Sequence, residues 1–167
     1  MSSIRRELPA DREAIHAVHV ASFPTAAEAD LVDGLRAAGH LSISLVALEL
    51  GEVVGHVGFS PITVAGAPAG LGLAPVAVLP GHRQRGVAER LIREGLSLCR
   101  EAGVVLVVVL GDPRYYSRFG FAPARLLAMR DEYEGGDAFQ AMELVRGTVP
   151  SGGGVVRYSP VFAALGV

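Results

Sequence analysis

A buried strand, a basic loop and an amphipathic helix follow one another in residues 76–92, and this run constrains the fold most. An apolar segment at 76–78 is followed by the basic sequence Arg-Gln-Arg-Gly at 83–86. A helical pattern then begins at Val87 without a Ser, Thr, Asp or Asn before it. A helix start without a side-chain cap leaves backbone N–H groups free, and such groups bind phosphate. The run therefore predicts a site for a phosphorylated cofactor.

Length and composition indicate a single domain spanning residues 1–167, because 167 residues with 50% apolar side chains can form a substantial core. The net charge of −2 gives no reason to expect nucleic acid or a membrane surface as a partner. Cys99 is the only cysteine, which excludes an intrachain disulfide and favours a reducing compartment. It lies in a helical pattern, where a small buried thiol is expected rather than a nucleophile. We expect a cytoplasmic protein, since charged residues at 5–7 precede any apolar run and the apolar stretch 104–110 is too short to span a bilayer.

Strand and helix patterns alternate along the chain, which predicts the α/β class. Strands are expected at 4–8, 43–50, 53–59, 104–110, 138–145 and 155–158, with one more strand ending at Val78. Helices are expected at 9–22, 26–38 and 87–102, with a short helical turn after Pro113. Gly51-Glu52 is expected to be a hairpin turn, and residues 65–70, rich in Gly, Ala and Pro, a loop. The strand ending at Val78, the helix at 87–102 and the strand at 104–110 predict a right-handed βαβ unit.

Two phosphate-binding motifs fail at the loop before the helix. Gly81 and Gly86 have P-loop spacing, but Val87 and Ala88 stand where Lys and Ser/Thr belong, and the chain contains no lysine. The glycines also lack the G-x-G-x-x-G order of a dinucleotide-binding fingerprint.

A third motif fits. Arg83-x-x-Gly86-x-Ala88 resembles the R/Q-x-x-G-x-G/A signature of the GNAT superfamily of N-acetyltransferases. A second segment at the expected distance, Tyr116 followed by Gly120-Phe121, is similar to the family's Y-x-x-x-G-F element. Residues 110–121 as a whole are similar to a subgroup of small bacterial predicted acetyltransferases.

The resemblance implies a twisted mixed sheet flanked by helices, with two parallel strands that splay apart to admit acyl-coenzyme A, here acetyl-CoA as cosubstrate. The pantetheine arm is then expected on the main chain of Val76, Ala77 and Val78. The pyrophosphate is expected on Arg83, Gln84, Arg85, Gly86, Val87 and Ala88. Gly86 permits a close approach because it has no Cβ, and the helix dipole favours the anion. The side chains of Arg83 and Arg85 either contact phosphate or are solvated surface charges.

The resemblance also implies a general acid. Tyr116 matches the family's tyrosine that protonates the departing thiolate, and a phenol pKa near 10 keeps that proton at neutral pH. A packed core tyrosine is the alternative. Tyr115 lacks the spacing to Gly120-Phe121. Val109 stands where many members carry a cofactor-contacting Asn, and Asp112 is a candidate both for ligand contact and for capping a short helix.

The general base is not marked by any motif. His56, Glu28, Asp112 and Glu143 are candidates beside water, and His56 is also read as a hydrogen-bonded structural histidine. No metal is expected, because His16 and His19 lack a third ligand at metal-site spacing.

The favoured function is transfer of an acetyl or short acyl group from acyl-CoA to a primary amine on a small molecule or peptide, by a monomer or homodimer. The alternative is a non-catalytic acyl-CoA sensor or interaction module. Acidic residues gather before the strand at 138–145 and are read either as a wall that attracts a cationic amine or as a solvated loop. These residues are Asp131, Glu132, Glu134 and Asp137.

Overall fold

The computed structural model describes residues 2–166, which divide into two compact units. The first unit contains residues 2–60, 74–98 and 159–166, and the second contains 61–73 and 99–158. Strand β3 (Glu52–Val64), strand β4 (Ala67–Val78) and helix α3 (Val87–Glu101) contribute residues to both.

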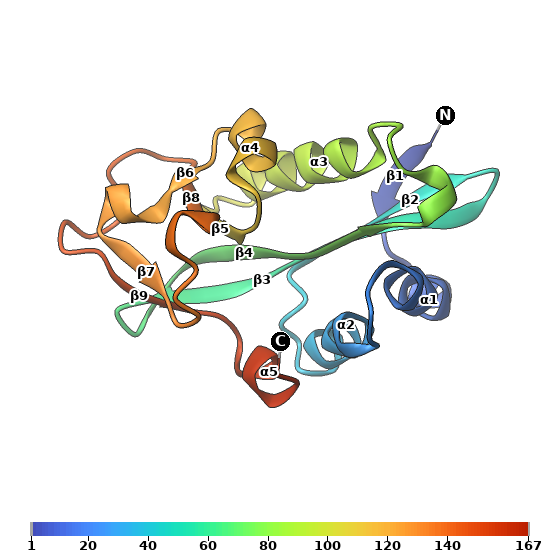
Figure 1. Ribbon diagram of the computed structural model, residues 1–167, viewed down its shortest axis with the longest axis horizontal. Coiled ribbons are helices and arrows are strands. Elements are labelled where there is room, and N and C mark those ends of the chain that lie inside the picture. The colour runs from blue at the N-terminus through green and yellow to red at the C-terminus, as the bar shows by residue number, and fades with distance from the viewer. Residues whose placement is uncertain (1, 167) are drawn as a thin grey trace. The chain divides into compact units, whose positions relative to one another are not determined.

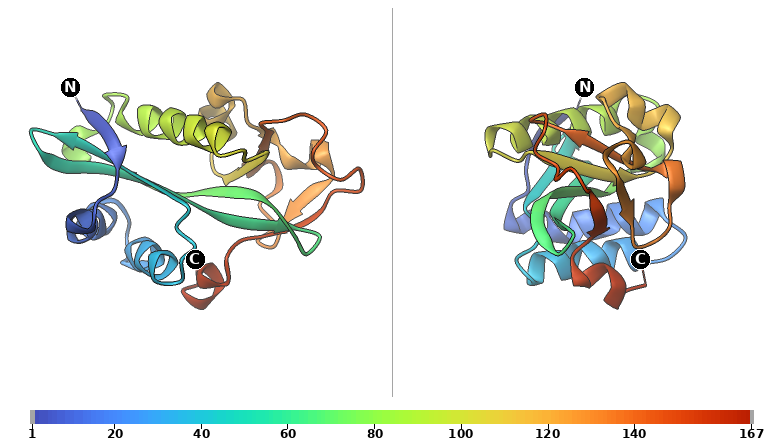
Figure 2. Two further views of the ribbon diagram at one scale, coloured as in Figure 1. Left: turned by 180° about the vertical axis from the view of Figure 1, so that it is seen from behind. Right: turned by 90° about the vertical axis from the view of Figure 1, so that its left-hand side faces the viewer.

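The first unit is a sheet covered by helices on both faces. Strands β1 (Ser3–Arg6), β2 (Ile43–Glu49) and β3 pair antiparallel, and β4 follows β3 in the sheet order. Helices α1 (Arg12–Ser22) and α2 (Ala27–Ala37) lie on one face of these strands, and α3 lies on the other (Figures 1 and 2). A 3₁₀ turn, η1 (Pro9–Asp11), precedes α1, and α5 (Pro160–Ala164) packs beside α2.

The core of this unit lies between the sheet and these helices. Fully buried side chains come from α1, α2, β2, β3 and α3: Ile15, Val32, Leu35, Val46, Phe59, Leu91 and Ile92. The helix α3 approaches β3 closely at Gly95, where an added Cβ would lie 2.4 Å from a ring carbon of Phe59. Glycine at position 95 therefore lets the ring and the helix pack directly against each other.

The second unit contains both parallel and antiparallel strand pairs. The first half of β4 pairs parallel with β5 (Leu106–Leu110), through Leu71 with Val107 and Gly72 with Val108. Strand β8 (Phe139–Glu143) pairs antiparallel with β5 and with β6 (Ala122–Pro123). Strand β9 (Gly154–Arg157) pairs antiparallel with the end of β3 and parallel with β7 (Met129–Asp131). The expected mixed sheet with flanking helices and the parallel pair are confirmed.

Short helical segments connect the strands. The first unit has η2 (Pro80–His82) before α3, and the second has α4 (Pro113–Tyr116), η3 (Ser117–Phe119), η4 (Ala124–Leu127) and η5 (Gly136–Ala138). The predicted helix at 87–102 matches α3 within one residue, and those at 9–22 and 26–38 match η1 with α1 and α2. Strands expected at 4–8, 104–110 and 138–145 are shorter than predicted: they span 3–6, 106–110 and 139–143. Cys99 is fully buried as expected, and burial raises the pKa of its thiol to about 11.

The predicted hairpin turn is wrong by one residue. Leu50 and Gly51, rather than Gly51 and Glu52, occupy the turn between β2 and β3, with φ of +50° and +79°. Two successive positive φ values match a turn whose twist suits an antiparallel hairpin. Leu50 accepts this backbone geometry and is fully exposed.

The predicted loop at 65–70 is also wrong. The turn is confined to Ala65 and Gly66, and β4 begins at Ala67. Gly70 lies so close to β5 that an added Cβ would be 2.1 Å from the carbonyl oxygen of Leu106. Glycine in this segment therefore permits close strand approach rather than a loop.

Within residues 2–166, the structure contains no helix of the length and apolarity needed to cross a membrane.

Candidate active site

The loop before α3 is exposed and partly in the left-handed backbone region. Residues 83–86 are exposed, Gln84 has φ of +62° and Gly86 has φ of +77°. A Cβ added at Gly86 would meet no protein atom within 4 Å, so the space in front of this glycine is open to solvent or a ligand. A non-glycine residue at positive φ is uncommon, and such strain is typical of ligand-binding loops.

Helix α3 starts directly after this loop. The N–H of Arg90 donates to the carbonyl of Gly86 at 3.0 Å, so Gly86 precedes the first helical turn and supplies no side-chain cap. Val87 is buried and anchors the turn, while Ala88 is half-buried. The fifteen-residue helix places the positive end of its dipole at the loop. This geometry is suited to an anion at the loop.

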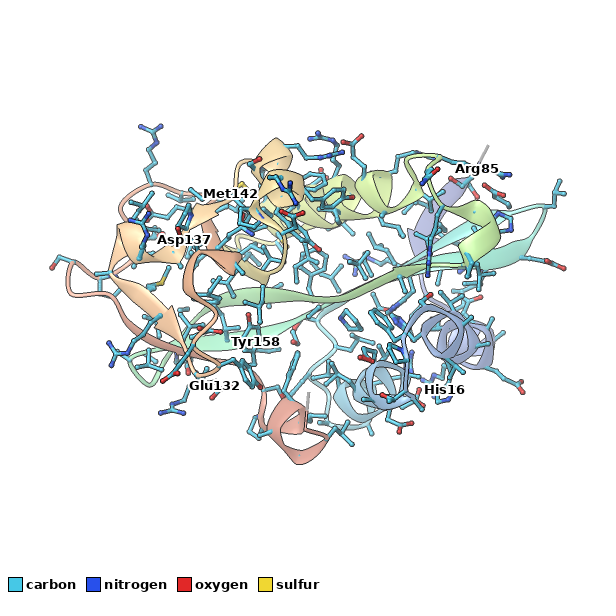
Figure 3. The ribbon with its side chains drawn as sticks, viewed as in Figure 1. His16, Arg85, Glu132, Asp137, Met142 and Tyr158 are labelled. Carbon is cyan, nitrogen blue, oxygen red and sulfur yellow. The ribbon has the colours of Figure 1, made fainter. Side chains whose placement is uncertain are left out.

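Glu49 of β2 contacts one residue before the loop and one residue within it. Its carboxylate lies 2.5 Å from His82 Nδ1 and 3.5 Å from an Arg85 guanidinium nitrogen. The Arg85 side chain is still 58% exposed and extends along the outside of the unit (Figure 3). No local sequence pattern indicates Glu49, because it lies 33 residues before His82.

The carbonyl oxygen of Val78 already accepts a hydrogen bond within the protein. Arg83 Nε donates to it at 2.9 Å, whereas the Ser22 hydroxyl donates its single proton to the nearer Val18 carbonyl at 2.6 Å. Arg83 is therefore tied to the end of β4 rather than fully solvated. Val76 is half-buried, whereas Ala77 and Val78 are buried. The expected pantetheine contacts of this strand stay a prediction.

Tyr116 closes α4 in the second unit and packs among aromatic rings. Its ring contacts Tyr115 at 5.1 Å, Phe121 at 6.0 Å and Phe119 at 6.2 Å between centroids. Gly111 makes room for it, because an added Cβ would lie 2.4 Å from Tyr116 Cε2. Burial raises the pKa of Tyr116 to about 12, with a contribution from Tyr115, so the phenol remains protonated at neutral pH.

The neighbours of Tyr116 have structural contacts. The Arg118 guanidinium lies 4.4 Å above the Tyr115 ring, and its Nε donates to the Tyr115 carbonyl at 3.0 Å. Asp112 caps α4, since its Oδ1 accepts from the Arg114 N–H at 2.9 Å. The capping interpretation of Asp112 is thus confirmed.

Three of the four general-base candidates are engaged elsewhere. Asp112 caps α4, and Glu143 accepts backbone hydrogen bonds from Thr148 at 3.0 Å and Val149 at 3.2 Å. His56 is fully buried between two hydrogen-bond partners. Glu28, in the first turn of α2, has one enclosed carboxylate oxygen without a hydrogen-bond partner among residues 2–166.

A chain of buried polar groups surrounds His56 and confirms its structural interpretation. The Ser44 hydroxyl donates to the Glu7 carboxylate, which also binds Arg36 at 2.8 Å. A serine has one hydroxyl proton, so Ser44 must accept from His56 Nε2, 2.8 Å away. His56 Nδ1 then accepts from His19 Nε2, also at 2.8 Å.

His16 has two acidic neighbours that come from another helix. Its Nδ1 lies 2.8 Å from Asp33 Oδ2, and one ligand atom each from His16, Asp30 and Asp33 lie within 4.8 Å of one another. The carboxylates come from α2, so helix packing rather than spacing along one helix assembles the cluster.

Comparison with known proteins identifies the family. Residues 3–124 match a family model described as an acetyltransferase (GNAT) domain. The uncharacterized N-acetyltransferase YhbS of Escherichia coli K12 is 41% identical over 162 residues, which span 95% of this chain and 97% of that relative. This chain belongs to the GNAT family of N-acetyltransferases.

Two solved GNAT structures share the whole fold. The crystal structure of E. coli YhbS in complex with CoA superposes with a TM-score of 0.93 at 41% identity, covering 97% of this chain and 92% of that one. A GNAT family acetyltransferase from Brucella melitensis in complex with acetyl-CoA has a TM-score of 0.82 at 39% identity, covering 97% and 98%. The predicted GNAT family, mixed α/β fold and N-acetyltransferase class are therefore confirmed.

Proposed function

We propose that this GNAT acetyltransferase moves an acetyl group from acetyl-CoA to a primary amine by direct attack, as one domain spanning residues 1–167. The exposed loop 83–86, held in strained geometry at the start of α3, carries this proposal. The YhbS and Brucella relatives that bind CoA and acetyl-CoA support it.

The loop binds the pyrophosphate through main-chain N–H groups of Arg83, Gln84, Arg85, Gly86, Val87 and Ala88. The helix dipole adds attraction, and Gly86 leaves the approach open. The main chain of Val76, Ala77 and Val78 holds the pantetheine arm. Because Arg83 occupies the Val78 carbonyl, the half-buried Val76 offers the more accessible groups.

The chemistry forms a carbon–nitrogen bond and breaks the thioester carbon–sulfur bond. The amine, in its neutral form, attacks the acetyl carbon and loses a proton to a base or to water. The sulfur leaves with the bonding electrons and takes a proton from the Tyr116 hydroxyl. A phenol with a pKa of about 12 is protonated at neutral pH, so Tyr116 holds this proton when the carbon–sulfur bond breaks. The phenolate left on Tyr116 regains a proton from solvent. The products are an N-acetyl amine and free CoA.

The acceptor is a small molecule or a peptide amine, and the compartment is the cytoplasm. Cys99, a free thiol, fits a reducing environment. We propose no nucleic-acid or membrane partner.

The experiment that tests the site compares two glycine variants by thermal unfolding with and without CoA. CoA is expected to raise the Tm of the wild type by mass action. Gly86→Ala adds a methyl group in the ligand's approach path and should weaken CoA binding roughly tenfold or more. Gly103→Ala is the matched control, because Gly103 also has open space around it and a φ of +78°. Both variants should lose similar stability from backbone strain.

Equal CoA-induced Tm shifts in both variants would mean that the loop 83–86 does not bind CoA. A wild type that binds CoA but releases no thiol with any amine would instead support the acyl-CoA sensor.

A further inference from the structure

The acidic segment before β8 is not a uniform charged surface. Asp137 is paired with Arg125 at 2.7 Å, and Glu132 with Arg157 at 3.3 Å. Asp131, the last residue of β7, is buried and only 5% exposed. The acidic-wall interpretation is therefore corrected: one carboxylate faces inward, and two have cationic partners at the surface (Figure 3 shows Asp137 and Glu132).

Only one of the two carboxylate oxygens of Asp131 has a hydrogen-bond partner among the described residues. Its Oδ1 accepts the Gly135 N–H at 2.8 Å. Its Oδ2 is enclosed and has no hydrogen-bond partner in the part of the chain that the structure describes. A buried ionised oxygen without a partner is costly, and native proteins rarely keep one without a ligand, ion or water beside it.

Asp131 also lines a cavity of about 320 Å³ within the second unit. Apolar side chains of Met129 and Phe139 contribute to its wall. The charged side chains around it are three carboxylates and two guanidinium groups: Asp131, Glu134, Asp137, Arg125 and Arg130. Such a volume is typical of small-ligand sites, and apolar walls with one buried charge suit an organic cation.

One cation of the lining is already paired. Arg125 forms its ion pair with Asp137, and both side chains are more than 60% exposed. Asp137, rather than Asp131, is therefore the partner of Arg125.

We propose that this cavity binds the ammonium group of a cationic amine, with the Asp131 carboxylate as its counter-ion. The inference rests on the proposed function, because it assigns the chemical class of the acceptor: an amine with a second, positively charged group and an apolar stem of a few carbons. The ammonium lies near the Asp131 carboxylate, and the stem lies against Met129 and Phe139.

A series of contacts connects this cavity with Tyr116. An added Cβ at Gly135 would lie 3.1 Å from Asp131 Oδ2 and 2.4 Å from Leu110 Cδ1, so Gly135 packs between them. The next residue after Leu110, Gly111, donates its N–H to the Ala138 carbonyl at 2.9 Å and packs against the Tyr116 ring. The amine site and the proposed general acid are thus built on one continuous set of contacts in one unit.

The first experiment measures binding of a charged probe and its neutral counterpart by titration calorimetry, with and without CoA. Butane-1,4-diamine, a dication at pH 7, is expected to bind the wild type, and butane-1,4-diol is expected not to bind. Asp131→Asn should weaken diamine binding roughly tenfold or more, because it removes a buried charge partner. The amide oxygen of the asparagine can still accept the Gly135 N–H, which keeps the fold. Glu52→Gln, an exposed carboxylate in the other unit, is the matched control and should bind as the wild type does.

The second experiment uses Arg125→Gln, for which the proposal predicts the opposite sign. Removal of this guanidinium frees Asp137 and lowers the positive charge at the cavity rim, so diamine binding should tighten about two- to threefold, within the range of surface charge effects. Equal binding of diamine by wild type and Asp131→Asn would overturn the proposal, as would equal binding of diol and diamine.

The experiments can contradict the cation site without contradicting the acetyl-CoA assignment, and the reverse. CoA-induced thermal shifts should be the same for wild type, Asp131→Asn and Arg125→Gln, because none of these changes touches the loop 83–86. Diamine binding that depends on Asp131 in a protein without a CoA shift would retain the cation site and remove the acetyl-CoA assignment.

Discussion

At the scale of single residues, the role of Tyr116 can be separated from that of its neighbour. Tyr116→Phe retains the ring and its packing but removes the acidic proton. We expect kcat to fall roughly 10²-fold with CoA binding unchanged, as for loss of a general acid. Steady-state kinetics with thiol detection measures this change.

Tyr115→Phe is the matched control. The Arg118 guanidinium can still lie over the phenylalanine ring, so this variant should keep kcat within about twofold. A larger loss in Tyr115→Phe than in Tyr116→Phe would move the general acid to position 115.

Gly111 gives a second prediction at this scale. In Gly111→Ala the new methyl group meets the Tyr116 ring at 2.4 Å, so the ring must move. A displaced acid should lower kcat roughly 10-fold or more while leaving the CoA thermal shift intact, because misplaced catalytic groups lose rate. In the Tyr116→Phe background the same substitution should have little further effect on kcat. Additive losses in the double variant would show that Gly111 acts independently of Tyr116.

At the scale of elements, the packing of α3 on β3 depends on a glycine. Alanine normally stabilises a helix interior by about 1 kcal/mol relative to glycine. At position 95 the added Cβ would lie 2.4 Å from Phe59, and overpacking costs about 1–3 kcal/mol. We therefore expect Gly95→Ala to lower the free energy of unfolding in urea.

Ser97→Ala tests the same helix at an exposed position. It should leave stability unchanged or raise it by a few tenths of a kcal/mol. A stabilising Gly95→Ala would mean that the Phe59 ring moves aside at little cost.

Periodicity predicted the long elements of this fold because each has one buried face. Helix α3 has a regular apolar face, and its predicted and observed bounds agree within one residue. The segment 67–70 was misread because its glycine serves a contact with Leu106, a residue 36 positions later. Local sequence cannot show such an approach, since glycine suits loops and tight strand contacts equally.

The candidate site likewise contains residues that the local sequence indicates and residues that it does not. The sequence predicts residues 83–88 and Tyr116 as site residues because each belongs to a contiguous motif. No local pattern indicates Glu49 or Gly111, because they act through tertiary contacts with His82 and Tyr116. Asp131 was named among four acidic residues, but only its burial separates it from the others.

At the scale of the whole molecule, buried histidines make folding stability depend on pH. Burial lowers the pKa of His19 to about 4, and burial with the nearby His19 and Arg36 holds the pKa of His56 well below its ordinary value. The unfolded chain therefore binds more protons than the folded protein below pH 6.5. Stability should fall as pH drops from 6.5 to 4, by up to about 1.4 kcal/mol per pH unit for each histidine.

Urea unfolding at intervals between pH 7.5 and 4.5 measures this slope. His19→Gln should flatten it, because the glutamine amide can donate to His56 Nδ1 without titrating. Glu7 acts at lower pH: burial alone would raise its pKa, but hydrogen bonds from Arg36 and Ser44 outweigh burial and lower it. Equal slopes for His19→Gln and wild type would exclude His19 as a source of the pH dependence.

The carboxylate of Glu49 has a consequence for turnover. Because it already pairs with Arg85, an anion that reaches the loop exchanges one negative partner of this guanidinium for another. The free energy gained is the difference between two ion pairs, which is smaller than that of a new pair at an unpaired cation. Under the proposed function, the same carboxylate competes with the coenzyme for Arg85 both before and after acetyl transfer. Glu49 therefore lowers the affinity of the loop for acetyl-CoA and for free CoA alike.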